Sequence, residues 1–194
     1  ACTATREIDA TGLALMPGII DSHTHFDAQI TWDAYVRPSP AMGVTTAVIG
    51  NCGFTIAPCR PKDRELTMRN LTQVEGMSLD VLRQGIRWNF ETFAEYLVQL
   101  RAGGSAVNLA AYVGHSSVRT WVMGADAPQR EARPEEIAQM CDLVRASMAA
   151  GALGIAQAAP DLVGKERQVD EMRARGHEEE AAARDERRRQ ALAG

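Results

Sequence analysis

Cysteines and aromatic residues are few in this sequence, and no segment is strongly basic. Aromatic residues make up 5% of the 194 residues, and there are four cysteines: Cys2, Cys52, Cys59 and Cys141. Their scattered positions provide no paired framework, so we expect thiols rather than disulfide staples. The pI near 5.6 lies below the range expected of a phosphate-binding surface, which argues against a nucleic-acid partner.

Long hydrophobic runs are also absent. No stretch approaches the ~20 apolar residues that a bilayer-spanning helix needs, and residues 1–8 lack the basic and apolar regions of a signal peptide. We therefore expect no membrane partner and a cytoplasmic location. The remaining composition, 45% hydrophobic and 24% charged with a net charge of −4, is typical of a globular domain. Because the chain starts without Met and enters strand-like sequence at once, we expect it to be a fragment.

Short apolar runs alternate with helix signals. Residues 6–20 predict strand, turn and strand, with the turn at Thr11-Gly12, and Ile19 and Ile20 are expected to be buried. Further buried strands are predicted at Val44–Ile49 and at residues 107–113 and 153–156.

Helices are predicted between these strands. A short one ends at residues 39–43, and a second begins at the Thr92 and Glu95 capping box and stops at Gly103-Gly104. The clearest begins at Pro134 and ends at Gly151. Its expected core-facing stripe has helical spacing: Ile137, Met140, Cys141, Val144 and Met148.

The alternation predicts an α/β fold with a parallel sheet. Periodicity does not distinguish the first half of an eight-stranded barrel, which needs ~250 residues when complete, from a smaller doubly wound sheet. The charged segment 161–194, with 17 charged residues out of 34, predicts a solvated helix outside the core.

Two histidines follow the first predicted strand, in the order His23-Thr24-His25. Side chains at i and i+2 of an extended chain point to the same side, so both rings can reach one cation at ~2.1 Å. The alternative is a pair of solvated or capping histidines. Their place at a strand end, where α/β active sites lie, and the nearby Asp27 favour the metal. Asp21 is a candidate to orient one of the two rings.

A thiol follows the second predicted strand, in Gly50-Asn51-Cys52-Gly53. A thiolate is a strong zinc ligand, and flanking glycines let the backbone approach a ligand closely. The alternative is a small buried thiol in a tight turn. Cys52 and Cys59 are spaced too widely for a usual structural zinc pair. His115 ends the third strand and would face the same sheet edge, as a substrate or metal residue or simply as a structural one.

These segments resemble a known family. Residues 17–27 (PGIIDSHTHFD) are similar to the first-strand signature of the amidohydrolase superfamily. Val44-Thr45-Thr46 with Gly50-Asn51-Cys52-Gly53, supported by Val113-Gly114-His115, resemble its D-aminoacylase branch, the N-acyl-D-amino-acid deacylases. The likeness covers roughly residues 6–156.

The resemblance implies a partial (β/α)8 barrel of about four strands in residues 16–160, with residues 1–15 a remnant of a β-sandwich and residues 161–194 a tail outside the core. It implies that His23, His25 and Cys52 bind zinc, while Asp21, Asp27, Asn51 and His115 are possible supporting or substrate residues. Zinc would activate a water that attacks the acyl carbonyl of a small-molecule N-acyl-D-amino acid.

The sequence departs from this pattern after Ala156, where the later ligands and the general-base aspartate are expected but have no candidate. We therefore expect weak zinc binding and little deacylase activity from this chain. The alternatives are a cyclic-amide hydrolase or deaminase of the same superfamily, against which Cys52 argues, and a non-catalytic barrel fragment whose open strand edge would invite association.

Overall fold

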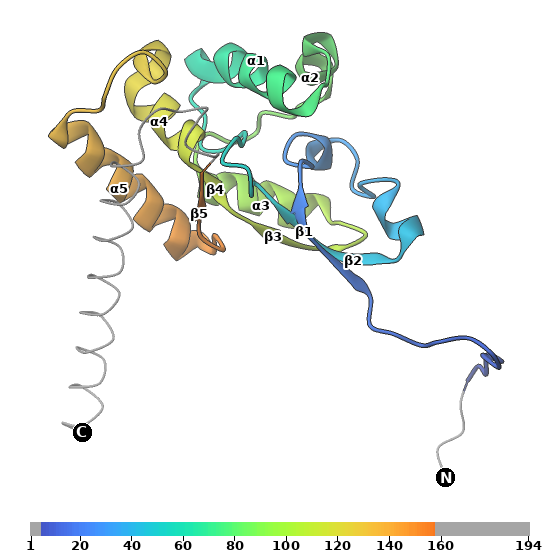
Figure 1. The fold of residues 1–194 in the computed structure, drawn as a ribbon. Coiled ribbons are helices and arrows are strands. Elements are labelled where there is room, and N and C mark those ends of the chain that lie inside the picture. Colours follow the sequence, from blue (N-terminus) through green and yellow to red (C-terminus); the bar gives the residue numbers. More distant parts are fainter. Residues whose placement is uncertain (1–4, 158–194) are drawn as a thin grey trace, which may run out of the picture.

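The structure, a computed structural model, describes residues 5–157 (Figure 1). The predicted tail helix at residues 161–194 and Cys2 lie outside the described residues. Five strands and five α-helices follow one another in the described part, with short 3-10 turns between them. The strands are β1 (Ile19–Thr24), β2 (Val44–Ile49), β3 (Asn108–Ala111), β4 (Val113–Gly114) and β5 (Ile155–Ala156). The helices are α1 (Arg64–Glu75), α2 (Leu79–Gly85), α3 (Phe93–Gly103), α4 (His115–Met123) and α5 (Pro134–Ala150).

All the strand pairs in the described residues are parallel, as the alternation predicts. β2 lies between β1 and β3, and β4 pairs with β5. Only Tyr112 separates β3 from β4, so residues 107–113 form nearly one strand, as expected. The predicted strand at residues 153–156 is shortened to its last two residues. Because β1 and β2 run the same way in the three-stranded sheet, the residues that follow them gather at one edge of it.

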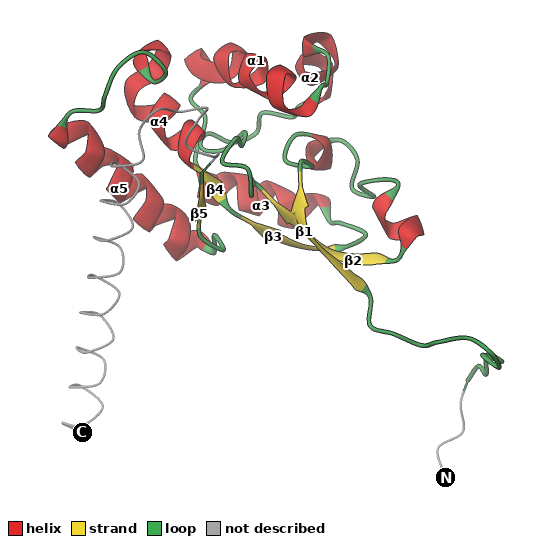
Figure 2. Cartoon of the chain, in the orientation of Figure 1, coloured by secondary structure: helices red, strands yellow, loops and turns green. Residues whose placement is uncertain are grey.

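The N-terminal segment differs from the prediction. The turn at Thr11 and Gly12 is present, but residues 5–18 form no strand and extend away from the sheet as loop (Figure 2). Ile19 and Ile20 are exposed rather than buried, at 46% and 68%. The reason is that β1 has β2 on one side and no partner strand on the other within residues 5–157. An extended segment without a partner does not satisfy its backbone groups as a strand.

Two helices were predicted well. The Thr92 hydroxyl accepts from the backbone of Glu95, whose carboxylate accepts from the backbone of Thr92, so α3 begins with the expected capping box. Helix α5 begins at Pro134 and ends at Gly151 in the left-handed conformation. Met148 is the exception to its expected stripe, because it is 45% exposed.

The short 3-10 helix Ser39–Met42 occupies the predicted place before β2. Helices α1, α2 and α4 have no counterpart in the prediction. The apolar faces of α1 and α4 are interrupted by polar residues that the tertiary structure buries, such as Thr67, Ser117 and Arg119. Burial of these hydroxyls and of the guanidinium depends on hydrogen-bond partners outside the helix, so periodicity does not indicate it.

The core lies between the sheet and the helices. Its largest fully buried side chains include Ile49 of β2, Tyr96 of α3, Val113 of β4 and Val118 of α4. Cys59 and Cys141 are buried, and Cys52, Cys59 and Cys141 are not in disulfide bonds, as expected. Within residues 5–157, no helix combines the length and the apolar character needed to cross a membrane.

Candidate metal centre

The predicted ligands are drawn together at the ends of β1 and β2. β1 includes His23, His25 follows it, and Cys52 lies three residues after the end of β2. The ring centroids of His23 and His25 are 5.2 Å apart. The Sγ atom of Cys52 is 3.6 Å from Nδ1 of His25. Sequence positions 27 residues apart are thus in side-chain contact.

Both spacings suit ligands of one tetrahedral zinc ion. With Zn–S near 2.3 Å and Zn–N near 2.1 Å, a tetrahedral angle separates sulfur and nitrogen by ~3.6 Å, and two coordinated imidazoles have centroids ~5.3 Å apart. The two observed distances, between the histidine rings and between Cys52 and His25, each agree with the expected value. This is not yet a complete site, because no group of three or more His, Cys, Asp or Glu side chains within residues 5–157 is arranged to hold a metal ion. His23 is exposed, so its ring has room to turn toward the other two side chains.

A tight loop presents the sulfur. Gly50 and Gly53 have φ values of 78° and 81°, which favour glycine. A Cβ atom on Gly50 would lie 2.5 Å from the carbonyl oxygen of Tyr112, so the loop packs directly on the neighbouring strand. Inside the loop, the backbone N–H of Phe54 points at the Cys52 Sγ atom, at 3.4 Å. The loop therefore fixes both the place and one hydrogen bond of the thiol.

Two of the candidate supporting residues join this loop to the histidine segment. Asn51 donates from Nδ2 to the carbonyl oxygen of Ser22 at 2.9 Å. Asp27 is 2% exposed, and its Oδ2 accepts from the backbone N–H of Gly50 at 3.2 Å. The hydroxyl of Tyr96 in turn donates to the Asp27 carbonyl oxygen at 2.9 Å. These contacts hold the chain before His23 and after His25 against the Cys52 loop.

The electrostatic surroundings favour an uncharged histidine here. Burial, with a smaller contribution from the neighbouring His23, lowers the pKa of His25. The neutral ring is the form that coordinates a metal. Burial raises the pKa of Asp27 to about 7, although hydrogen bonds from the backbone oppose the shift. Asp27 is thus a buried support of the loop rather than a solvated acid.

Asp21 and His115 have no contact with the Cys52 sulfur among the hydrogen bonds of the described residues. The Asp21 carboxylate accepts from the backbone N–H of His23, at 3.3 Å, and so contacts the main chain of the segment instead of a ring. His115 is the first residue of α4, is 2% exposed, and its Nε2 atom has no hydrogen-bond partner within the described residues. Burial and the nearby Arg119 lower the pKa of His115 to about 4. A metal role for His115 stays a prediction.

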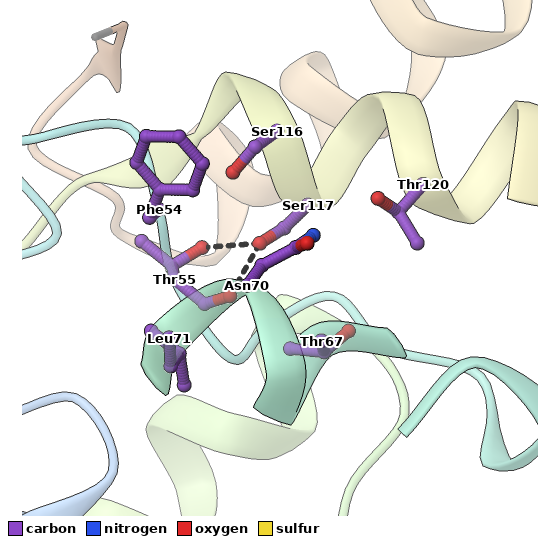
Figure 3. Close-up of a pocket in the computed structure, with 8 residues that line it drawn as sticks. All are labelled: Phe54, Thr55, Thr67, Asn70, Leu71, Ser116, Ser117 and Thr120. Carbon is purple, nitrogen blue, oxygen red and sulfur yellow. Dashed lines mark hydrogen bonds between the residues drawn. The ribbon is translucent and has the colours of Figure 1, made fainter. Parts of the chain in front are cut away.

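A set of hydroxyls beside the Cys52 loop, from Thr55, Ser116 and Ser117, was not predicted from the sequence (Figure 3). Ser116 donates from Oγ to the carbonyl oxygen of Gly53, at 2.5 Å. Ser117 donates from Oγ to the carbonyl oxygen of Thr55, also at 2.5 Å. The Oγ atoms of Thr55 and Ser117 lie 2.8 Å apart. Single serines and threonines carry no sequence signature, and only the start of a helix at His115 could have suggested them.

Next to these hydroxyls is a small cavity between α1, α4 and the loop (Figure 3). It offers about 10 Å³ to the centre of a water molecule, which is room for roughly one water. Its lining is mostly polar: Phe54, Thr55, Thr67, Asn70, Leu71, Ser116, Ser117 and Thr120. The histidines and Cys52 do not line it, so it is not the place where a substrate would meet those ligands.

Comparisons with known proteins show which family the chain is similar to. The model of the family described as "Amidohydrolase family" matches residues 6–191. That match continues past Ala156, where we expected the likeness to end. A D-aminoacylase of Alcaligenes xylosoxydans xylosoxydans is 42% identical over 156 residues, which are 80% of this chain and 30% of that protein.

Two solved structures are similar in fold. One is a D-aminoacylase studied for its binuclear metal centre, with 38% identity and a TM-score of 0.56 over 73% of this chain and 27% of that one. The other is an N-acyl-D-glutamate deacylase from Bordetella bronchiseptica in complex with zinc and a phosphonate inhibitor, with 27% identity and a TM-score of 0.57 over 74% of this chain and 27% of that one. The chain therefore spans less than a third of the length of these relatives.

Proposed function

Because the chain belongs to the amidohydrolase family, we propose that His23, His25 and Cys52 bind zinc and that this site serves the hydrolysis of N-acyl-D-amino acids. The observation that carries the proposal is the 3.6 Å contact between the Cys52 sulfur and the His25 ring nitrogen. A thiol and an imidazole at this spacing, joined by a second imidazole, are a soft donor set that suits zinc. The relatives named for D-aminoacylase and deacylase activity point to the substrate class.

The proposed reaction adds water across the amide bond. The acyl carbon gains the hydroxyl and becomes a carboxylic acid, while the nitrogen gains a proton and leaves as the free amine of a D-amino acid. Zinc supplies Lewis-acid catalysis and lowers the pKa of water toward ~7 when it is bound. The chain's own residues contribute the ligands and their support: Asp27 and Asn51 hold the two ligand segments together, and burial lowers the pKa of His25, which favours its neutral ring.

We also propose that the described strands are the first strands of a (β/α)8 barrel. The parallel order and the gathering of ligands at the carboxyl ends of the strands support this, since active sites of such barrels lie at that face. The unpaired side of β1 would then be where the barrel closes. A general-base aspartate from a later strand belongs to the same proposal, and no residue between 5 and 157 is assigned to it.

Metal analysis of the purified chain tests the zinc site. After loading with zinc and removal of the excess, we expect bound zinc that EDTA removes, and a loss of at least about tenfold in affinity for Cys52→Ser and for His25→Ala. Cys141→Ser is the matched control, since Cys141 is a buried thiol on α5. Zinc binding that survives both ligand substitutions, or that Cys141→Ser abolishes equally, would overturn the assignment.

A pair of enantiomers tests the substrate class. The zinc-loaded protein is incubated with an N-acetyl-D-amino acid and its L form, and release of the free amine is followed. The test uses the ratio of the two rates and not their absolute size. The proposal requires that the measured rate favour the D form and fall in His25→Ala. Equal rates on both enantiomers, or a rate that His25→Ala leaves unchanged, would contradict a D-specific deacylase.

A further inference from the structure

The peptide group between Gly53 and Phe54 connects helix α4 to the sulfur of Cys52. On one side of this peptide, the Gly53 carbonyl oxygen accepts two hydrogen bonds from Ser116, one from the backbone N–H at 3.1 Å and one from Oγ at 2.5 Å. On the other side, the Phe54 N–H donates to the Cys52 Sγ atom at 3.4 Å. In a trans peptide the C=O and N–H bonds point in opposite directions. Fixing the oxygen therefore fixes the direction of the N–H.

We propose that Ser116 is a positioning residue for Cys52, which acts by clamping the Gly53–Phe54 peptide so that its N–H is directed at the sulfur. The inference rests on the proposed function, because it assigns Cys52 as a ligand. Both acceptor positions of the Gly53 oxygen are used by one residue, so the peptide plane has little freedom to rotate. Loss of the Ser116 hydroxyl removes one of the two hydrogen bonds. The peptide plane can then rotate about the remaining bond from the Ser116 N–H.

The surroundings support a rigid clamp. The end of β4 approaches the loop so closely that a Cβ atom on Gly114 would lie 2.6 Å from the Gly53 oxygen. The Gly114 N–H donates to Thr55 Oγ1 at 3.2 Å, and Ser117 binds the Thr55 backbone. Figure 3 shows Thr55 and Ser117 facing each other across this junction. The first turn of α4 therefore holds the loop at two consecutive points.

A second step links the clamp to metal binding. A hydrogen bond from an amide to the sulfur of a ligand directs its lone pairs and its electron density, as supporting groups do at other metal sites. A peptide free to rotate would allow the thiol to leave the position 3.6 Å from the His25 ring. Since changes in such supporting groups typically weaken metal binding by 10–100-fold, we expect a loss of this order when the Ser116 hydroxyl is removed.

The experiment compares three variants of the 194-residue chain with the unaltered protein. Ser116→Ala removes the hydroxyl, Ser116→Thr retains one, and Ser147→Ala is the matched control. Ser147 also donates from Oγ to a backbone carbonyl, that of Leu143 at 2.8 Å, but lies on α5. Hydrogen exchange of the metal-free protein is followed by mass spectrometry on the peptide that covers residues 50–56. Cobalt(II) is then titrated in place of zinc, and the thiolate-to-cobalt charge-transfer absorption gives both the affinity and the state of the sulfur.

The expected result is faster exchange in residues 50–56 and at least about tenfold weaker cobalt binding with an altered charge-transfer band in Ser116→Ala. Ser116→Thr should restore most of the slow exchange and of the cobalt affinity, and Ser147→Ala should leave both unchanged. Unchanged exchange and an unchanged band in Ser116→Ala would overturn the inference while leaving the zinc site standing. If the unaltered protein shows no thiolate-to-cobalt band, the proposed function fails, and equal exchange in Ser116→Ala and the unaltered chain would then overturn the clamp as well.

Discussion

The carboxylate of Asp27 accepts a hydrogen bond from the backbone N–H of Gly50 at 3.2 Å, inside the protein. Asp27 follows the histidine segment and Gly50 opens the loop that carries Cys52, so this one bond joins the two halves of the candidate site. Burial of a carboxyl costs free energy, which is why the pKa of Asp27 rises to about 7. The hydrogen bond from Gly50 offsets part of that cost and fixes the position of the loop relative to the histidine segment.

Removing the Asp27 side chain should destabilise the protein and weaken zinc binding together. Asp27→Ala leaves the buried Gly50 N–H without its acceptor, which costs about 1–3 kcal/mol. Asp27→Asn keeps an oxygen that can accept this bond and should cost less than Ala. Urea denaturation of the metal-free chains gives the free energy of unfolding, and zinc affinity is measured in parallel. If Asn and Ala were equally destabilising, the acceptor role of Asp27 would be excluded.

Gly50 should tolerate no side chain, for a reason beyond its backbone angle. Gly50→Ala and Gly76→Ala both place alanine at a positive φ, 78° and 66° respectively. A Cβ on Gly76 meets nothing within 4 Å, whereas one on Gly50 would overlap the Tyr112 carbonyl oxygen at 2.5 Å. We expect about 1 kcal/mol of destabilisation from the backbone angle in both, and a further 1–3 kcal/mol, roughly, from overlap in Gly50→Ala alone.

Comparing the two alanine variants isolates the overlap. Free energies of unfolding from urea titrations are sufficient, and zinc affinity should fall only in Gly50→Ala because only that loop carries a ligand. Equal losses of stability in the two variants would mean that the loop can move away from β3 and β4, and that it is held less tightly than the structure indicates.

The sequence could bring His23, His25 and Cys52 together as candidates because they sit at places that local pattern reveals. His23 and His25 alternate along an extended segment, and Cys52 follows a run of buried β-branched residues by a glycine turn. In each case the strand and the turn are encoded within a few residues. β2 was placed to the residue for the same reason.

The contacts that support these three side chains could not be predicted from local sequence patterns. The partner of Asp27 is 23 positions away and that of Ser116 is 63 positions away. Such pairs are set by how the Cys52 loop packs against the histidine segment and against α4, which no local pattern reports. The prediction that Ile19 and Ile20 are buried was wrong for a related reason. An apolar run indicates a strand that can be buried, but the residues that would cover it are far away in the sequence.

The three described cysteines should differ strongly in their reaction with iodoacetamide. Cys52 is half-buried, while burial raises the pKa of the Cys59 thiol to about 11 from 9.0. Two pH units correspond to an about hundredfold smaller thiolate fraction at neutral pH, and the thiolate is the reactive form. We expect Cys52, whose side chain is less buried, to be modified faster than Cys59. Zinc should slow only the reaction of Cys52.

Peptide mass spectrometry resolves the cysteines in one reaction, so Cys141, which is also buried, serves as an internal control. His25→Ala should abolish the protection by zinc without changing the slow rate of Cys59. Protection of all the thiols to the same degree would point to general tightening of the fold and away from a ligand role for Cys52.

His115 should make the stability of the protein fall as the solution becomes acidic. Its pKa is about 4 in the folded chain, below the ordinary 6.5, because the ring is buried and lies near Arg119. Between these two values the unfolded chain binds more protons at this residue than the folded chain does, so acid favours unfolding. The stability is complete above pH 6.5 and is lost progressively as the pH falls toward 4. From pH 7.5 to pH 5 we expect a loss of about 1–2 kcal/mol from this residue.

The measurement is the free energy of unfolding by urea at several pH values from 5 to 7.5, with EDTA present so that metal binding does not contribute. Other groups titrate in this range, including His25, whose pKa is also lowered. His115→Leu removes only one of them and should flatten the pH dependence by the stated amount, whatever it does to stability at pH 7.5. The same slope in both proteins would show that the His115 ring accepts a proton in the folded state as readily as in water.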